Sequence, residues 1–424
     1  MELKEIDKKD EVGFLPNNWK VVKIGNVFEF KNGLNKEKSF FGYGIPIINY
    51  MDVYRNNKLT SKDIVGKVNL TNSEIKNYEI KKGDVLFTRT SETPEEIGIS
   101  AVVMEDLYNT VFSGFLLRAR PINKTIAIDY CKYCFTTKAV RKEIISKSSY
   151  TTRALTNGRL LSSVKLVIPN SLSEQTAIAT ALSDADALIS SLEKLIDKKR
   201  KIKQGVMKRL LKPKVGWAVE MLDDECELIT KGTTPTSVGR DFQSSGISFI
   251  KIESLTRTGK IIKDKTAFID LDTHLILKRS QLKVGDLLFS IAGALGRVAM
   301  VEKDVLPANT NQALAIVRLK HDSKIHLNYL FHYLNSEYIQ RHIINMSVQG
   351  AQANLSLLNI AQLPIGFPSY SEQVDIGQII DDIEVQIEIL EMKLNKFTSI
   401  KSGMMQNLLT GTIRLVKKEE LKAV

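Results

Sequence analysis

One amphipathic segment occurs twice in this chain, and this duplication constrains the fold more than any other feature of the sequence. Residues 173–211 and 371–409 align without a gap and are identical at 15 of 39 positions, including the opening Ser-Glu-Gln. Apolar residues recur in alternating steps of four and three, which is the heptad seam of a coiled coil. The seam positions are 178, 182, 185, 189, 192 and 196 in the first copy and 376, 380, 383, 387, 390, 394 and 397 in the second.

Both copies are therefore expected to form long helices. Ser173 and Ser371, each followed by an acidic residue, are the predicted N-caps, because a hydroxyl group and a negative charge both suit the start of a helix. Two such helices in one chain most economically bury their seams against each other. We predict an antiparallel pair, because a whole domain separates the two copies in the sequence.

The segments that precede the two helices also repeat, more loosely. Trp19 and Trp217 lie 198 residues apart, and each opens a stretch typical of a β-strand. Residues 80–87 (IKKGDVLF) match residues 282–289 (LKVGDLLF) at five of eight positions, which predicts a Gly-Asp turn followed by a buried strand. Each segment ends in apolar residues and a proline just before its long helix.

The repeat predicts an α+β fold in which domains and helices alternate. Two mixed α/β domains, both β-rich, are separated and followed by the long helices, which pair as an antiparallel coiled coil with a pseudo-twofold internal repeat. The predicted boundaries are 1–170 for the first domain, 171–212 for the central helix, 213–369 for the second domain, and 370–424 for the C-terminal helix and tail.

One loop between matching strands differs strongly between the two domains. Ten residues, TRTSETPEEI, lie between Phe87 and Gly98, whereas only six, SIAGAL, lie between Phe289 and Gly296. A loop that changes in length and chemistry on a shared scaffold is typical of domains that bind different surfaces.

The charge balance favours a polyanionic partner. The chain has 60 Lys and Arg against 48 Asp and Glu, a formal net charge of +12, and an ordinary hydrophobic fraction of 43%. The charged opening residues and the lack of a long apolar run predict a cytoplasmic protein without a membrane span. Cys131 and Cys134 have the spacing of half a zinc site, but no second cysteine pair exists to complete it. Because they align with Leu330 and Tyr333, we predict that they are apolar helix positions and that no metal binds.

Four short motifs complete the pattern. They are a Pro-x(2–3)-Ser-Glu-Gln entry to each long helix, a Gly-x-Met-x-x-Leu-Leu helix end, Lys-Gly-Thr-Thr-Pro at 231–235, and Gly-Ala-Gln-Ala-Asn-Leu-Ser at 350–356. With these motifs in this order over nearly its whole length, the chain resembles the specificity subunit of a type I restriction–modification enzyme.

The resemblance implies two target-recognition domains, each reading one half of a bipartite double-stranded DNA site. The paired helices would form a spacer that fixes the gap and docks two methyltransferase subunits. The subunit itself would be non-catalytic and would need no cofactor. Its methyltransferase partners bind S-adenosylmethionine and methylate adenine, and restriction subunits that use ATP join them in the full complex.

The candidate DNA contacts lie in loops that flank the repeated strands. Arginine can fork onto guanine and amide side chains onto adenine, while hydroxyl groups bind phosphate. The candidates of the first domain are Thr88, Arg89, Thr90, Ser91, Thr151, Thr152, Arg153, Asn157 and Arg159; those of the second domain are Lys231, Thr233, Thr234, Ser290, Gln349, Gln352 and Asn354. For each single residue, an ordinary polar loop residue is the competing interpretation. The first domain has KNGLNKEKSF from Lys31 where the second has KGTTPTSVGR, so contacts cannot be copied from one domain to the other.

Two other functions compete with DNA recognition. A coiled-coil scaffold that joins two protein-binding domains would also explain the duplication, although the net charge and the arginine- and amide-rich loops favour DNA. An autonomous methyltransferase or nuclease is disfavoured, because the chain has neither an Asn/Asp-Pro-Pro-aromatic motif nor a glycine-rich nucleotide loop. A steep fall of DNA affinity with salt, together with sequence preference, would separate the DNA subunit from the scaffold.

Overall fold

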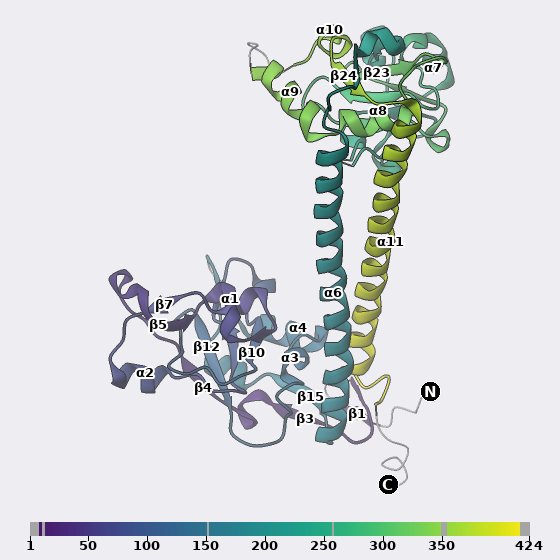
Figure 1. Ribbon diagram of the computed structural model, residues 1–424. Coiled ribbons are helices and arrows are strands. Elements are labelled where there is room, and N and C mark those ends of the chain that lie inside the picture. The colour runs from purple at the N-terminus through teal and green to yellow at the C-terminus, as the bar shows by residue number, and fades with distance from the viewer. Residues whose placement is uncertain (1–7, 11–12, 151, 257, 349–353, 416–424) are drawn as a thin grey trace. The chain divides into compact units, whose positions relative to one another are not determined.

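The computed structural model describes residues 8–10, 13–150, 152–256, 258–348 and 354–415 (Figure 1). The chain divides into two compact units, one formed by Met1–Glu193 with Lys393–Val424 and the other by Lys194–Met392. Each unit holds one β-rich domain and parts of two long helices, α6 (Leu172–Leu210) and α11 (Tyr370–Leu408). The α+β fold with two long helices is therefore confirmed.

The first domain contains a five-stranded main sheet. The strands of the whole first domain are β1 (Lys8–Asp10), β2 (Gly13–Leu15), β3 (Trp19–Lys23), β4 (Phe28–Asn32), β5 (Phe41–Ile48), β6 (Lys58–Leu59), β7 (Lys67–Val68), β8 (Val85–Thr88), β9 (Thr90–Ser91), β10 (Ser100–Val103), β11 (Val111–Phe112), β12 (Leu116–Pro121), β13 (Ser149–Tyr150), β14 (Ala154–Leu155) and β15 (Lys165–Pro169). Its helices are α1 (Tyr50–Arg55), α2 (Asn72–Tyr78), α3 (Cys131–Cys134), α4 (Lys138–Lys147) and α5 (Gly158–Ser162). The main sheet has the order β4–β12–β8–β10–β6, and the smaller sheets are β11–β5–β7, β13–β14–β9, β15–β3 and β1–β2.

The second domain repeats this plan with fewer strands. They are β16 (Ala218–Met221), β17 (Cys226–Lys231), β18 (Ile247–Ile250), β19 (Ala267–Ile269), β20 (Leu287–Ser290), β21 (Val298–Met300), β22 (Ala308–Thr310), β23 (Leu314–Leu319) and β24 (Pro364–Phe367). Its helices are α7 (Leu271–Ile276), α8 (Leu327–Leu334), α9 (Glu337–Val348) and α10 (Leu357–Ala361). The sheet order β17–β23–β20–β21 matches β4–β12–β8–β10, and β16–β24 matches β3–β15. The strands β8 and β20 are buried along their whole length, which explains why both are nearly continuous apolar runs.

The repeated Gly-Asp turn is held by one buried ion pair in each domain. Asp84 accepts two hydrogen bonds of 2.7 Å from Arg120, and Asp286 accepts bonds of 2.7 and 2.8 Å from Arg318. Both carboxylates also accept a hydrogen bond from the backbone N–H three residues earlier, at 2.8 and 2.7 Å. The hydrogen bonds with these carboxylates raise the pKa of Arg120 and of Arg318. The sequence repeat at this turn therefore preserves a bidentate anchor between the turn and the strand β12 or β23.

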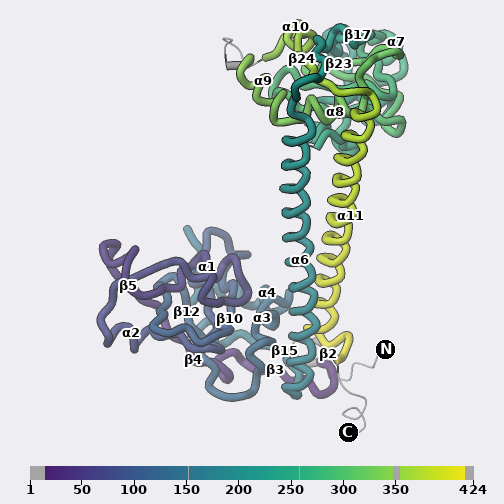
Figure 2. Tube along the Cα trace, viewed as in Figure 1, coloured from purple at the N-terminus to yellow at the C-terminus, as the bar shows by residue number. Residues whose placement is uncertain are grey.

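The long helices pair in antiparallel fashion within each unit (Figure 2). In the second unit, Lys203 contacts Glu384, and Arg200 contacts Glu391 at 2.5 Å, so that lower numbers on α6 meet higher numbers on α11. In the first unit, Lys401 of α11 contacts Asp186 of α6 at 2.5 Å. Predicted seam residues are buried in both helices, among them Ile178, Leu182, Leu192, Ile196, Ile376, Ile380 and Ile387. Residues 198–214 are rich in lysine and arginine, and two of these cations, Arg200 and Lys203, are paired with acidic side chains of α11.

The predicted N-caps are wrong by two residues. The helices begin at Leu172 and Tyr370. The Ser171 hydroxyl accepts a hydrogen bond from Glu174 N–H, and the Ser369 hydroxyl accepts one from Glu372 N–H, at 3.4 Å in both cases. Both copies read Ser-x-Ser-Glu-Gln, so the sequence offered two serines for the same role. The serine of the Ser-Glu-Gln motif lies inside the first turn.

The glutamine of each Ser-Glu-Gln motif joins the helix start to its domain. The Gln175 amide donates to the carbonyl oxygens of Thr125 and Pro169 at 3.1 and 2.9 Å, and its oxygen accepts from Ala127 N–H at 2.7 Å. Both Gln175 and Gln373 are completely buried. The repeat of this motif therefore preserves a buried set of hydrogen bonds between the start of the long helix and the domain before it, which we call the joint.

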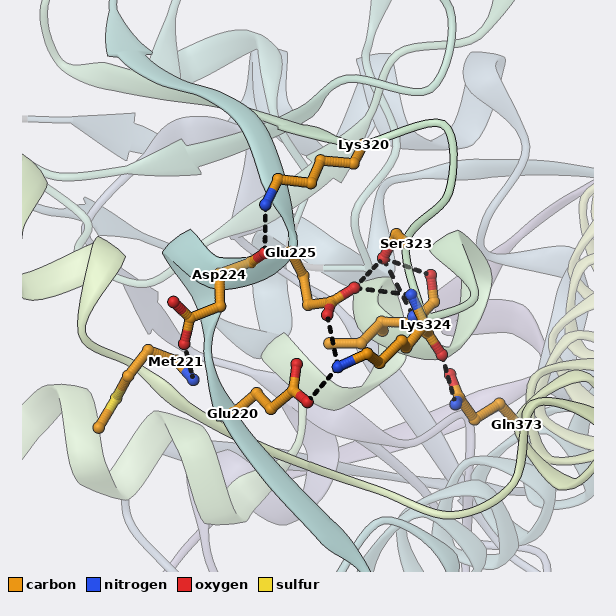
Figure 3. Close-up of polar contacts among 9 residues, drawn as sticks. Glu220, Met221, Asp224, Glu225, Lys320, Ser323, Lys324 and Gln373 are labelled. Carbon is orange, nitrogen blue, oxygen red and sulfur yellow. Dashed lines mark hydrogen bonds and ion pairs between the residues drawn. The ribbon is translucent and has the colours of Figure 1, made fainter.

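The second domain forms the same joint around Gln373. Gln373 donates to the carbonyl oxygens of Lys324 and Pro368 at 3.0 and 3.1 Å and accepts from His326 N–H at 2.8 Å. Figure 3 shows Gln373 beside Lys324, whose ammonium group lies 2.6 Å from Glu220. The hydrogen bond from Lys324 lowers the pKa of Glu220.

The two cysteines of the CKYC segment are apolar helix positions, as predicted. Cys131 and Cys134 are buried in α3, and burial raises the pKa of Cys134 well above its ordinary value. The aligned residues Leu330 and Tyr333 are buried in α8. Within the described part of the chain, no group of side chains is arranged to hold a metal ion. The described helices also include none with the length and hydropathy needed to cross a membrane.

Candidate nucleic-acid interface

Four loop segments of the first domain meet at one edge of its main sheet. Gly33 donates through its N–H to Leu116 O at 3.2 Å, Arg89 N–H to Phe115 O at 2.9 Å, and Thr156 N–H to Arg89 O at 3.0 Å. We call the described residues among 31–35, 88–91, 113–116 and 149–157 the first loop edge. Backbone hydrogen bonds order these segments side by side, so the edge is a defined surface.

The second domain builds the same edge with the same backbone hydrogen bonds. Gly232 donates to Leu314 O at 3.4 Å, Ile291 to Ala313 O at 2.9 Å, and Leu355 to Ile291 O at 2.9 Å. Residues 231–235, 290–291, 310–314 and 354–356 form the second loop edge. The framework is thus repeated while the side chains change.

A glycine permits the closest approach within each edge. A Cβ atom on Gly33 would lie 2.0 Å from Ser113 O, and one on Gly232 would lie 2.0 Å from Thr310 O. No side chain can occupy either position without moving the backbone of the next loop. This is the physical reason for the glycine in Lys-Asn-Gly and in Lys-Gly-Thr-Thr-Pro.

Three of the predicted contact residues are structural. Thr88 and Ser290 are completely buried; the Thr88 hydroxyl donates to Glu96 O and accepts from Ile99 N–H, and the Ser290 hydroxyl donates to Ala294 O and accepts from Arg297 N–H. The buried Ser91 hydroxyl donates to Thr93 O. These hydroxyl groups close the hairpin loops, so we remove them from the candidate contacts.

The remaining candidates of the first domain lie on the first loop edge or directly beside it. Arg89 and Thr90 are half-buried, and the Arg89 guanidinium donates to Gly114 O at 3.4 Å. Thr152 and Arg153 are exposed between β13 and β14. Exposed Asn157 uses its oxygen to cap α5, which leaves its NH₂ group for another partner, and Arg159 is exposed on α5. Thr151 lies outside the described residues.

The candidates of the second domain are also brought together. Lys231 is exposed at the end of β17, Thr233 accepts a hydrogen bond of 3.1 Å from Arg279, and Thr234 bonds to Gln312. Asn354 is exposed two residues before Ser356, the N-cap of α10. Gln349 and Gln352 lie outside the described residues.

The structure adds three polar residues that the sequence analysis missed. Arg279 and Gln312 are exposed at the second loop edge and hold the Thr-Thr pair, and Asn35 lies against Gly114 in the first. Arg279 and Gln312 stand in segments without any repeated motif. The only sequence signal for Asn35 is that it lies two residues after Gly33 in a polar loop.

Two lysines, Lys31 in the first loop edge and Lys36 directly after its first segment, already have partners. Lys31 donates to Asn77 O at 2.6 Å, and burial, followed by the charges of Arg118 and Arg120, lowers its pKa. Lys36 contacts Glu74 at 2.7 Å. Loop arginines, rather than these lysines, are therefore the cations that the first loop edge offers to an anion.

Comparison with known proteins decides the family. The family model described as "Type I restriction modification DNA specificity domain" matches residues 16–204 and again 214–398. The chain belongs to this family. The predicted resemblance to a type I specificity subunit is thereby confirmed, and with it a non-catalytic role in DNA recognition.

Individual members of the family align with this chain over almost its full length. The chain is 24% identical to the putative type I restriction enzyme MjaX specificity subunit of Methanocaldococcus jannaschii, over 96% of both chains. It is also 24% identical to the MjaVIII specificity subunit of the same organism, over 95% of this chain and 94% of the relative. The crystal structure of a type I restriction–modification S subunit from M. genitalium has a similar fold, with a TM-score of 0.57, 14% identity, and coverage of 94% and 98% of the two chains.

Proposed function

We propose that the two domains read the two halves of one bipartite double-stranded DNA site, with the loop edges as their reading surfaces. The observation that supports this proposal is the repeated backbone framework, which presents different side chains in each domain. Identical frameworks place side chains in equivalent positions, so two different sets of side chains would select two different short sequences. The proposed boundaries of the two readers are 1–170 and 213–369.

We further propose that the paired helices dock two methyltransferase subunits and that restriction subunits join the full complex. In the second unit, Leu195 and Ile202 on α6 lie seven residues apart and are 40% and 42% exposed. Val385 and Met392 on α11 have the same spacing and are 53% and 64% exposed. Such apolar stripes outside the buried seam fit a bundle with helices of a partner.

Genome-wide mapping of modified adenines tests the reading of a bipartite site. Co-expression with the cognate methyltransferase subunit in an unmethylated host should give one split motif, with two short half-sites and a fixed unspecified gap. Replacing residues 1–170 with the corresponding domain of another specificity subunit should change one half-site and leave the other unchanged. If the partner is active with another specificity subunit but gives no modification with this one, the chain would be a scaffold.

Arg153 provides a test of how much the positive charge of the first loop edge contributes to DNA affinity. Because Arg153 is exposed at the first loop edge, Arg153→Ala should weaken binding to all DNA sequences by a similar factor. It should make the plot of log affinity against log salt less steep by about one. The readout is a salt titration of the assembled methyltransferase complex. The control is Lys142→Ala, which removes an exposed cation from α4, and an equal effect of both variants would contradict a specific role for Arg153.

A further inference from the structure

An exposed aromatic side chain stands in the first loop edge. Phe115 is 60% exposed, although Phe87 and Phe112 nearby in the same fold are completely buried. A single exposed apolar residue is ordinary on a protein surface. Phe115 is different because it shares this edge with two further exposed apolar residues, Tyr150 at 56% and Leu155 at 42%.

The backbone holds Phe115 in place. Its carbonyl oxygen accepts from Arg89 N–H at 2.9 Å, and its own N–H donates to the Ser113 hydroxyl at 3.2 Å. The preceding residue, Gly114, accepts from the Arg89 guanidinium at 3.4 Å and lies so close to Asn35 that a Cβ atom there would be 1.9 Å from the Asn35 amide oxygen. The phenyl group is therefore presented from a turn that is fixed on both sides.

The second domain has a different chemistry at the matching positions. The backbone bonds Arg89–Phe115 and Thr156–Arg89 correspond to Ile291–Ala313 and Leu355–Ile291. Alanine thus replaces the phenyl group at an equivalent place in the framework. Since the same fold forms with alanine, the phenyl group is not needed to build the edge.

We propose that Phe115 makes an apolar contact with a base and determines the base preference at one position of the half-site read by the first domain. This inference rests on the proposed function, because it assumes that the first loop edge faces DNA. A phosphate offers no apolar surface, so a phenyl group at a DNA interface is best buried against a thymine methyl group or the face of a base at an opened step. Because Arg89 N–H holds the Phe115 carbonyl, the apolar contact of the phenyl group would lie next to the polar side chain of Arg89.

The first experiment maps modified adenines for the complex of the full chain with its methyltransferase subunit. Phe115→Ala should relax one position of one half-site and leave the other half-site and the gap unchanged. Phe115→Leu should keep part of the preference, because it retains an apolar side chain. The matched control is Tyr108→Ala, which removes an aromatic side chain that is 87% exposed and precedes β11 in the same domain.

A binding experiment then identifies the apolar surface. Each thymine of the first half-site is replaced in turn by uracil, which lacks only the methyl group. A methyl contact predicts that one replacement weakens binding of the unaltered complex about tenfold and has no effect on Phe115→Ala. A contact with a base face predicts that no uracil matters, while Phe115→Ala still loses about tenfold for the cognate site. In both cases the salt dependence should stay unchanged, because no charge is removed.

Two results would overturn the inference. One is an unchanged motif and affinity in Phe115→Ala; the other is an equal loss of affinity for cognate and unrelated DNA. Failure of the proposed function has a different signature, since the unaltered complex would then give no split motif at all. The second half-site serves as an internal control for folding, because a misfolded chain could not direct modification to any site.

Discussion

Replacing Gln175 with alanine is expected to lower the free energy of unfolding of the first unit by about 4 kcal/mol, because one buried and two partly buried backbone groups lose their partner and a cavity is left. The side chain is completely buried and makes three hydrogen bonds, two to carbonyl oxygens and one from an N–H group. Gln373→Ala should have a similar effect on the second unit, since its three bonds are equivalent.

The two tryptophans allow the unfolding of each unit to be measured separately. Trp19 belongs to the first unit and Trp217 to the second, and the chain has no other tryptophan. Denaturant unfolding of the full chain, in Trp217→Phe and Trp19→Phe backgrounds, gives one fluorescence transition for each unit. Gln175→Ala should shift the Trp19 transition, and Gln373→Ala the Trp217 transition.

The control for both variants is Gln378→Ala. Gln378 is exposed on α11 and bonds only to the exposed Asp382, at 2.7 Å, among the contacts of the described residues. Its loss should cost less than about 0.5 kcal/mol. If Gln175→Ala were as mild as Gln378→Ala, the joint would contribute nothing to stability, and the repeat of Ser-Glu-Gln would need another explanation.

The long helices and their pairing could be predicted because the heptad pattern of apolar residues is sustained over many turns and occurs twice in the chain. The start of each helix could not be predicted to the residue, because Ser171 and Ser173 are both acceptable N-caps in the sequence. Only the structure shows that Ser171 caps the helix and that the first turn, with the buried Glu174 and Gln175, begins two residues earlier than predicted.

The candidate DNA contacts were harder to predict, because a polar residue in a loop can bind a partner or close the loop. Thr88 and Ser290 close their loops, and their burial depends on hairpin hydrogen bonds that no local sequence pattern predicts. Gln312 and Asn35 were missed for the opposite reason: their importance comes from loops distant in sequence. Phe115 was missed because an apolar residue between strands is usually buried.

Replacing Arg414 with alanine is expected to destabilise the first unit by about 3 kcal/mol, because it leaves a buried carboxylate without its cation. Glu174 is 1% exposed and accepts two hydrogen bonds from Arg414, one of them at 2.7 Å. The same guanidinium donates to Asn17 O at 2.6 Å and lies 5.8 Å from the ring of Trp19. Arg414 thus joins the segment after α11 to the start of α6 and to the start of β3 in the first domain.

The second unit contains a weaker version of the same arrangement, which makes a matched control. Lys214 lies 5.3 Å from the ring of Trp217 and 3.9 Å from Glu372, whose side chain is 48% exposed. Water can solvate Glu372 when the lysine is removed, so Lys214→Ala should cost less than about 1 kcal/mol. The two sites therefore combine the same residue types, cation, carboxylate and tryptophan, at different burial.

Fluorescence-detected unfolding separates the two sites, with Trp19 reporting Arg414→Ala and Trp217 reporting Lys214→Ala. The double variant Glu174→Gln with Arg414→Met should recover part of the loss, because it removes the buried charge together with its partner. Equal shifts for Arg414→Ala and Lys214→Ala would mean that burial of the carboxylate does not govern the strength of the contact. A shift confined to Arg414→Ala would establish that residues beyond α11 stabilise the first unit, since Glu174 of α6 finds its cation only there among the described contacts.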